Sequence, residues 1–280
     1  MKKITLDEVR ILSRYIYDIS KITLDQSKAY LIESRLSELL KEQNCSSFYE
    51  LYQRAKADLT KSLEKKIIDK ITTKETYFFR DNRPFELLQH KILPDLIDMR
   101  TAKSSKFFPI SIRIWSAACS TGQEIYSIAI VIKELLPDLT KYNVKISGTD
   151  ISDAAIARAS YGVFNKFEIE RGLTHDKLEK YFIPFKDKWK VKDELRAMVS
   201  FSKHNLMFSF THIGKFDIIF CRNVGIYFSS EDRKKLFNKI ADVLAQDGYL
   251  IIGATESLTN ICSRFEPKRH LKSVYYQLKK

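Results

Sequence analysis

The sequence predicts an α/β protein in which a mainly parallel sheet follows an all-helical N-terminal domain. From residue 111 onward, short apolar runs alternate with helical patterns, as they do along chains that build parallel sheets. Residues 1–72 show only helical patterns and contain no glycine. A small antiparallel sheet is expected as an insertion at about residues 160–202, from strand-like runs at 182–185, 189–192 and 197–201. The expected division is therefore 1–72, a linker with an entry helix at 73–110, and the α/β domain at 111–280.

The composition fits a globular protein with one large domain or two modest ones. The chain has 280 residues, of which 44% are hydrophobic. No apolar run approaches the ~18 residues that span a bilayer, and the N-terminus lacks a signal-peptide core, so we expect no membrane insertion. None of the four cysteines forms a Cys-x-x-Cys pair. We therefore expect no metal site, no disulfide framework and a cytoplasmic location.

The chain is strongly basic, with a formal net charge of +13 at pH 7. Such a charge is compatible with a nucleic acid, an anionic membrane or an acidic protein as partner. The basic residues are spread along the chain and do not gather in one arm or tail. An ordinary solvated basic surface therefore explains the charge as well as a functional surface does.

The N-terminal domain begins with a capping box, in which Thr5 and Glu8 precede apolar residues spaced three and four apart. Further helices are expected at 26–41, after Ser47 and at 63–71. Lys28 and Arg35 lie seven residues apart and therefore on nearly one face of the second helix. This pair is either an ordinary solvated face or a docking stripe for an acidic helix.

Between the two domains, the aromatic residues Tyr77, Phe78 and Phe79 stand directly before Arg80. Pro84 follows a turn and predicts the start of the entry helix, because proline is favoured at the first helical position. Two interpretations of the aromatic run are open. The rings form a wedge between the domains, or they roof a site into which Arg80 points.

The first strand of the α/β domain, at 112–115, runs into a loop of small residues at 116–122 and then into a helix. In an open α/β sheet, this turn is where a nucleotide-like cofactor binds. The loop lacks a Gly-x-Gly-x-x-Gly pattern, so a phosphate cradle is not indicated. Asp150 ends the second strand, where an acid can accept hydrogen bonds from both ribose hydroxyls. Arg222 and Asn223 follow a further buried strand, so three strand ends converge on one edge.

The end of the chain adds a helix, then Leu-x-x-x-Gly-x-Leu from Leu244 to Leu250 before a strand, and a last strand at 273–278 that we expect to be antiparallel. This pattern is common in class I methyltransferases, which have a Rossmann-like fold and use S-adenosylmethionine. More specific motifs occur in order along the chain: Thr76-Tyr-Phe-Phe-Arg80, Ser116-x-x-Cys-Ser-Thr-Gly-Gln-Glu124, Gly148-Thr-Asp150, Asn205-Leu206 and Phe220-Cys-Arg-Asn223-Val-x-Ile-Tyr227. Through these motifs nearly the whole chain resembles the chemotaxis receptor methyltransferases of the CheR family.

The resemblance implies transfer of a methyl group from S-adenosylmethionine to glutamate side chains of chemoreceptors, with S-adenosylhomocysteine as the second product. It implies that Arg80 and Tyr227 lie closest to the transferred methyl group. It also implies cofactor contacts from Lys74, Thr76, Arg80, Glu124, Asp150, Asn205, Leu206, Asn223 and Val224. At three of the family's positions the sequence departs from the usual residue. Lys74 replaces an asparagine, and Gln123 replaces a frequent acid next to Glu124. Gly225 replaces a large apolar residue, which we expect to loosen the loop that carries Asn223 and Tyr227.

The resemblance also favours the docking interpretation of Lys28 and Arg35, because the receptor helices are rich in glutamate. Family members that bind a C-terminal receptor peptide carry a glycine-containing loop in the inserted sheet. The corresponding segment here, 184–189, is short and has no glycine, so we expect no peptide tether. Nothing in the sequence indicates an obligate interface, and we expect a monomer.

Three other functions remain as alternatives. A nucleic-acid methyltransferase would fit the basic charge, but the sequence has no Asn-Pro-Pro-Tyr-like motif, no Pro-Cys pair and no clustered lysines or arginines. A signalling adaptor that binds cofactor or receptor without turnover is supported only by Gly225 and Lys74. A nicotinamide-dependent enzyme lacks the phosphate-binding glycines.

Overall fold

The computed structural model describes residues 3–102, 109–210 and 213–279. The N-terminal helices pack around a hydrophobic core of their own, which includes Leu12, Ile32 and Leu36. Thr5 and Glu8 form the predicted capping box. A 3-10 turn at Gln26–Lys28 precedes the second helix, so Lys28 lies just before that helix and Arg35 within it. The four helices of this domain are α1 (Leu6–Ser20), α2 (Ala29–Glu42), α3 (Phe48–Ala57) and α4 (Ser62–Ile71).

The second domain is built on a seven-stranded sheet with the strand order β6-β2-β1-β7-β8-β10-β9. Strands β6, β2, β1, β7 and β8 pair in parallel, whereas β10 pairs antiparallel with both of its neighbours. The predicted α/β class and the antiparallel last strand are therefore confirmed. The strands are β1 (Ile110–Ala117), β2 (Tyr142–Asp150), β6 (Val199–Lys203), β7 (Phe216–Cys221), β8 (Leu244–Ile252), β9 (Phe265–His270) and β10 (Ser273–Leu278).

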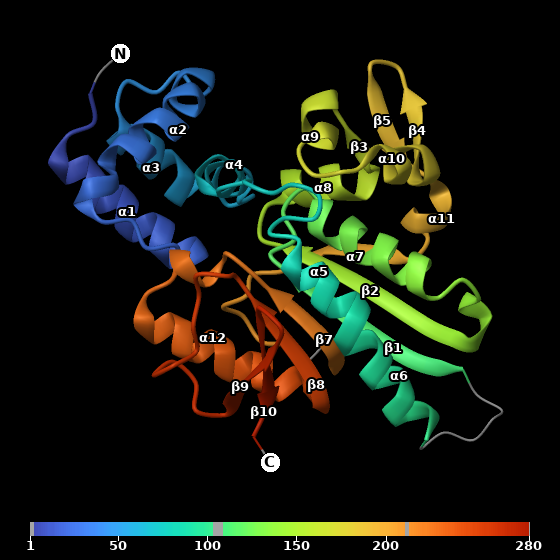
Figure 1. Cartoon of the computed structure of the whole chain (residues 1–280). Coiled ribbons are helices and arrows are strands. Elements are labelled where there is room, and N and C mark those ends of the chain that lie inside the picture. Colours follow the sequence, from blue (N-terminus) through green and yellow to red (C-terminus); the bar gives the residue numbers. More distant parts are fainter. Residues whose placement is uncertain (1–2, 103–108, 211–212, 280) are drawn as a thin grey trace.

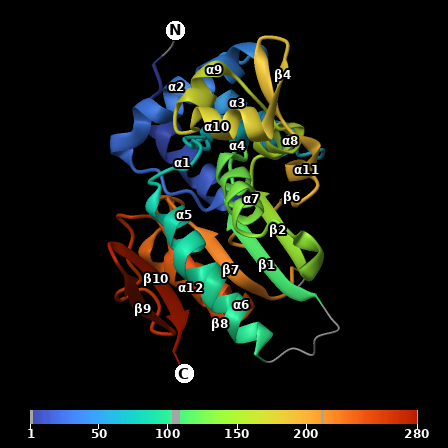
Figure 2. The ribbon, with the colours of Figure 1, turned by 45° about the vertical axis from the view of Figure 1, so that its right-hand side comes forward.

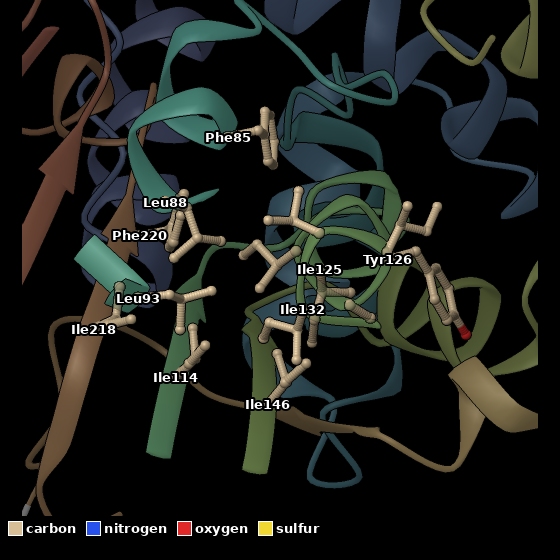
Figure 3. Close-up of a cluster of buried hydrophobic side chains, with 14 of the residues drawn as sticks. Phe85, Leu88, Leu93, Ile114, Ile125, Tyr126, Ile132, Ile146, Ile218 and Phe220 are labelled. Atoms are coloured by element: carbon tan, nitrogen blue, oxygen red, sulfur yellow. The ribbon is translucent and has the colours of Figure 1, made fainter. Parts of the chain in front are cut away.

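Helices cover both faces of this sheet. The entry helix begins at α5 (Arg83–Leu87), passes through a π-helical turn (Leu88–Ile92) and continues as α6 (Leu93–Thr101). It packs with α7 (Gln123–Leu135) over β1, β2 and β7, and Figure 3 shows the side chains of this core. On the other face, α12 (Ser230–Val243) packs against Trp115 and Ile219. Both faces are apolar because alternate residues of a buried strand point to opposite sides.

The inserted sheet has three strands in the order β3-β5-β4, with β3 at Val163–Phe164, β4 at Phe182–Phe185 and β5 at Lys188–Val191. Helices α9 (Lys166–Glu170) and α10 (His175–Tyr181) pack against it. Helix α8 (Asp153–Tyr161) instead packs on β2 and β6 of the main sheet, and α11 (Asp193–Arg196) contacts α7 and β6. One expectation was wrong. The run at 197–201 is not part of this sheet, because it forms β6, which pairs in parallel with β2 at the edge of the main sheet. A short half-buried strand has the same sequence pattern in either position, so only its pairing partner distinguishes the two.

The aromatic run before Arg80 forms a wedge between parts of the molecule. Phe78 is fully buried, and its ring packs edge-on against Phe164 and Phe182 of the inserted sheet. Phe79 packs against Phe85 of the entry helix. The rings thus anchor the linker on both sides, which fixes the backbone from which the Arg80 side chain departs.

Candidate active site

A cavity of about 350 Å³ lies at the carboxyl ends of β1, β2 and β7, under the helical domain. Figure 2 shows the helical domain (blue) above the ends of β1 and β2. Residues from the helical domain, the linker and the α/β domain all line the cavity. They include every site residue predicted from the sequence: Lys28, Arg35, Lys74, Thr76, Arg80, Glu124, Asp150, Asn205, Leu206, Asn223, Val224 and Tyr227.

Hydrogen bonds join the two domains beside this cavity. The hydroxyl of Tyr17 donates to Asp232 at 2.8 Å, and the backbone N–H of Thr23 donates to the carbonyl of Tyr227 at 2.9 Å. In Figure 1 the last turn of α1 accordingly reaches the orange segment before α12. The helical domain is therefore a wall of the site, because it bonds directly to the loop that carries Tyr227.

The loop after β1 bends through an unusual backbone. Ala118, Ser120 and Gly122 all have positive φ angles, of 62°, 51° and 98°. Such angles are unfavourable for residues with a Cβ, so this loop stores strain at the floor of the cavity. A Cβ on Gly122 would also lie only 3.0 Å from the Cβ of Ala159 in α8. The glycine thus permits close packing at the point where the chain enters α7.

Asp150 is buried at the end of β2, and its carboxylate is held by the loops on either side. Oδ2 accepts a hydrogen bond from the N–H of Ser120, and Oδ1 accepts one from the N–H of Ser152, both at 2.9 Å. Burial raises the pKa of Asp150, although these N–H groups act in the opposite direction. The hydroxyl of Ser152 in turn donates to Asp69 of the helical domain at 2.5 Å. Each oxygen keeps a further lone pair, so the carboxylate can still accept hydrogen bonds from a ribose.

Glu124, in the first turn of α7, is the second acid of the cavity. Its carboxylate accepts hydrogen bonds from the hydroxyl of Ser116 at 2.7 Å and from the guanidinium of Arg222 at 2.9 Å. The same guanidinium donates to the carbonyl of Arg80 and to the carboxylate of Asp81, each at 2.8 Å. The Arg222 side chain is only 1% exposed. Arg222 therefore joins the acid of α7 to the linker from beneath the cavity.

The sequence placed Arg222 at the converging strand ends, within a matching motif, but assigned it no contact or role. Its partners in the linker are more than 140 residues away in the sequence, and no local pattern indicates them. What the sequence does provide is the position of an arginine immediately after a buried strand. That position alone was a sufficient signal to place Arg222 at the converging strand ends.

Arg80 and Tyr227 both face the cavity from short connecting segments. The Arg80 guanidinium donates to the carbonyl of Glu75 at 2.7 Å and lies 5.8 Å from the ring centre of Tyr77. Among the described residues it forms no ion pair with a carboxylate, so its charge is available to an incoming anion. Tyr227 ends the 3-10 turn Gly225–Tyr227 and is half-buried.

Asn205 and Leu206 form the wall next to β6. The Asn205 side chain accepts a hydrogen bond from the N–H of Met207 at 2.8 Å, which closes a turn. From α12, the ammonium of Lys239 donates to the carbonyls of Leu206 at 2.7 Å and Phe208 at 2.9 Å. Lys239 therefore holds this segment from the side that faces away from the cavity.

The two residues predicted to dock a receptor lie at the rim of the cavity. Lys28 and Arg35 are both half-buried. The Arg35 guanidinium donates to the carbonyl of Ile71 and to the hydroxyl of Thr73, the latter at 3.1 Å. Arg35 thus ties α2 to the linker, a structural role that the sequence did not indicate.

Other kinds of site are absent from the described ranges. No group of three or more histidine, cysteine, aspartate or glutamate side chains is arranged to hold a metal ion in residues 3–102, 109–210 and 213–279. None of the helices in these ranges has the length and hydrophobicity needed to cross a membrane. Burial raises the pKa of the Cys119 and Cys221 thiols well above the usual range, so neither is suited to act as a nucleophile.

Comparison with known proteins identifies the family. Residues 7–72 match the family model described as CheR methyltransferase, all-alpha domain, and residues 74–273 match CheR methyltransferase, SAM binding domain. The chain is 39% identical to a chemotaxis protein methyltransferase of Vibrio parahaemolyticus, over 97% of this chain and 97% of that protein. It is 38% identical to chemotaxis protein methyltransferase Cher2 of Pseudomonas putida, over 92% of this chain and 93% of that protein.

A third relative, a chemotaxis protein methyltransferase of Borreliella burgdorferi, is 40% identical over 91% of this chain and 89% of that protein. The matched domains account for the cofactor as well, since the model that covers the cavity is that of a domain binding S-adenosylmethionine. With both of its domains matched in order, the chain belongs to the CheR methyltransferase family.

Proposed function

We propose that this protein methylates glutamate side chains of chemoreceptors, with S-adenosylmethionine as methyl donor, to give glutamyl methyl esters. The observation that carries the proposal is the cavity itself. It combines a pair of acids suited to the cofactor with Arg80, whose guanidinium has no carboxylate partner among the described residues. Arg80 would meet the substrate carboxylate, and Asp150 and Glu124 would hold the cofactor.

The chemistry requires little beyond alignment. A glutamate carboxylate has a reference pKa of ~4.3 and is ionised at neutral pH, so no general base is needed. When bound, the cofactor supplies an electrophilic methyl group on its sulfonium. Arg80 orients the carboxylate through charge-assisted hydrogen bonds, and the Tyr227 hydroxyl fixes one of its oxygens. The helical domain, bonded to Tyr227 through Thr23, keeps water away from the reacting atoms.

The reaction is tested with labelled S-adenosylmethionine and purified receptor cytoplasmic fragments. We expect label on the receptor as a base-labile methyl ester. Label on RNA would instead support a nucleic-acid methyltransferase, and binding of S-adenosylhomocysteine without transfer would support a signalling adaptor. Either result contradicts the proposal.

Replacing Arg80 tests the carboxylate contact. Arg80→Ala should lower turnover at saturating cofactor by roughly 100-fold, because a misaligned carboxylate loses the benefit of proximity. Arg83→Ala is the matched control, since Arg83 is exposed three residues further on and does not line the cavity. Wild-type turnover in Arg80→Ala would reject its role.

The inserted sheet supports the proposal that no receptor tail peptide is bound. Its hairpin joins β4 to β5 through a two-residue turn, with Phe185 paired to Lys188, and offers no loop extension. We expect no heat of binding when a C-terminal receptor peptide is titrated into the protein. Saturable binding at micromolar peptide would show that this hairpin suffices for a tether.

A further inference from the structure

The loop after β8 carries a glutamate, Glu256, that does not line the cavity but bonds to a residue that does. One oxygen of Glu256, Oε2, accepts a hydrogen bond from the backbone N–H of Asn223 at 2.7 Å and another from that of Gly253 at 2.8 Å. Glu256 does not line the cavity, and no motif described above contains it. Its carboxylate thus bridges the ends of two neighbouring strands, β7 and β8.

The residue that Glu256 holds has a left-handed backbone conformation. Asn223 has a positive φ of 56°, which is uncommon for most residues with a side chain and which asparagine adopts more readily than they do. Without Glu256, its N–H would lose a charge-assisted acceptor. The bond therefore stabilises Asn223 in the conformation that turns the chain from β7 into the loop of Val224 and Tyr227.

Two glycines make room for this carboxylate. A Cβ on Gly253 would lie 2.6 Å from Oε2, and a Cβ on Gly225 would lie 2.9 Å from Oε1. Gly225 does not have a positive φ, so its missing side chain leaves space and is not required for an unusual backbone angle. The effect of Gly225 on the looseness of the loop stays a prediction, and the space it leaves for Glu256 is a second reason for a glycine here.

The second oxygen of Glu256 argues against a purely stabilising role. Oε1 is buried and has no hydrogen-bond partner among the described residues. A buried charged oxygen without a partner costs free energy of folding. A buried carboxylate that keeps this cost while it orders the loop of Tyr227 calls for an explanation other than stability.

We propose that Glu256 is a positioning residue for methyl transfer. It acts through the backbone of Asn223 and sets the path of the loop that ends at Tyr227, while Thr23 of the helical domain holds the far end of that loop. This inference rests on the proposed function, in which Tyr227 contacts the substrate carboxylate.

The test compares Glu256→Ala and Glu256→Gln with Glu231→Ala, a control on the exposed first turn of α12. We expect Glu256→Ala to stay folded by circular dichroism and to lose about 10- to 100-fold in kcat. The KM for S-adenosylmethionine should change less. Glu256→Gln keeps one acceptor oxygen and should recover part of the kcat. Wild-type kcat in Glu256→Ala would overturn the proposal.

A double-mutant cycle with Tyr227→Phe separates positioning from general destabilisation. If Glu256 acts through the loop, Glu256→Ala should cost less than about threefold in kcat once the Tyr227 hydroxyl is gone. Losses that simply multiply would overturn the proposal.

A binding readout keeps this test apart from that of the proposed function. Calorimetry with S-adenosylhomocysteine needs no methyl acceptor, and Asn223 and Val224 line the cavity. Weaker binding by Glu256→Ala than by Glu231→Ala supports the positioning role even if no glutamate substrate is methylated. Where receptor fragments are methylated, kcat decides; where they are not, binding equal to that of Glu231→Ala rejects it.

Discussion

At the scale of single residues, the burial of Asp150 disfavours the ionised form of its carboxylate. Because burial raises its pKa, the ionised carboxylate costs free energy of folding at neutral pH. That cost is present above the raised pKa and disappears as the pH falls toward the ordinary value of an aspartate. The ionised acid therefore weakens the unliganded protein, and under the proposed function its carboxylate is there to bind the cofactor.

Asp150→Asn should therefore separate stability from binding. We expect the affinity for S-adenosylhomocysteine to fall roughly 10- to 100-fold, because hydrogen bonds from ribose to a charged acceptor are worth about 1.5–3 kcal/mol. The melting temperature without ligand at pH 7 should change little, because relief of the buried charge offsets the loss of one acceptor for the N–H groups of Ser120 and Ser152. Calorimetry and thermal unfolding measure the two effects.

Asp153→Asn is the control for this prediction. Asp153 lies three residues further along, pairs with Lys203 at 2.6 Å and does not line the cavity. If Asp150→Asn binds the ligand as the control does, Asp150 has no part in the cofactor site.

Sequence alone located residues such as Asp150 because parallel strands bring their carboxyl ends to one edge. It did not reveal what holds those residues in place. Arg222 and Glu124 are 98 positions apart, and Asn223 and Glu256 are 33 apart. Such pairs have no periodicity or spacing that a pattern can detect. The residues that line the cavity were therefore predictable, whereas the hydrogen bonds that support them were not.

At the scale of elements, α12 does more than cover the sheet. Lys239 donates to two carbonyls of the segment that carries Leu206. Burial lowers the pKa of Lys239 to about 8, so this ammonium is held where its charge is disfavoured. Through Lys239, α12 thereby fixes the segment that forms one wall of the cavity.

Lys239→Met keeps the length of the side chain and removes its N–H donors. We expect roughly fivefold weaker binding of S-adenosylhomocysteine, since about 1 kcal/mol per lost hydrogen bond is typical. Lys235→Met, one turn away and exposed, should bind as the wild type does. Calorimetry on both variants makes the comparison. Identical affinities would show that the segment of Asn205 and Leu206 keeps its conformation without the hydrogen bonds from Lys239.

The order of the elements was predicted more accurately than their pairing. The capping box at Thr5 and the antiparallel last strand rest on local patterns, and both are present. The strand β6 was assigned to the wrong sheet, because its pairing with β2 joins segments about 53 residues apart. Local propensity decides that a segment is a strand, and tertiary packing decides which strand it joins.

At the scale of the whole molecule, the helical domain supplies both a wall of the cavity and basic groups at its rim. Lys28→Glu should raise the KM for receptor fragments and leave the affinity for S-adenosylhomocysteine unchanged. A charge at the rim changes mainly the rate at which the receptor associates, so the effect on KM should shrink as salt is added. Steady-state kinetics at several salt concentrations measure it.

Lys41→Glu is the matched control, because Lys41 is exposed near the end of α2 and does not line the cavity. Arg35 is less suitable for this test, since its guanidinium also bonds to Ile71 and Thr73. Equal KM values for Lys28→Glu and Lys41→Glu would mean that the receptor docks elsewhere.

The shared cavity makes its occupant part of the contact between the domains. A molecule bound there touches both domains, so part of its binding free energy holds them together. Linkage is reciprocal: whatever draws the helical domain toward the sheet strengthens ligand binding by the same factor. Under the proposed function, a receptor that presses on the helical domain would thus slow the departure of the spent cofactor. Exchange of that cofactor and release of the receptor would then both depend on the same equilibrium, the one between closer and looser contact of the two domains.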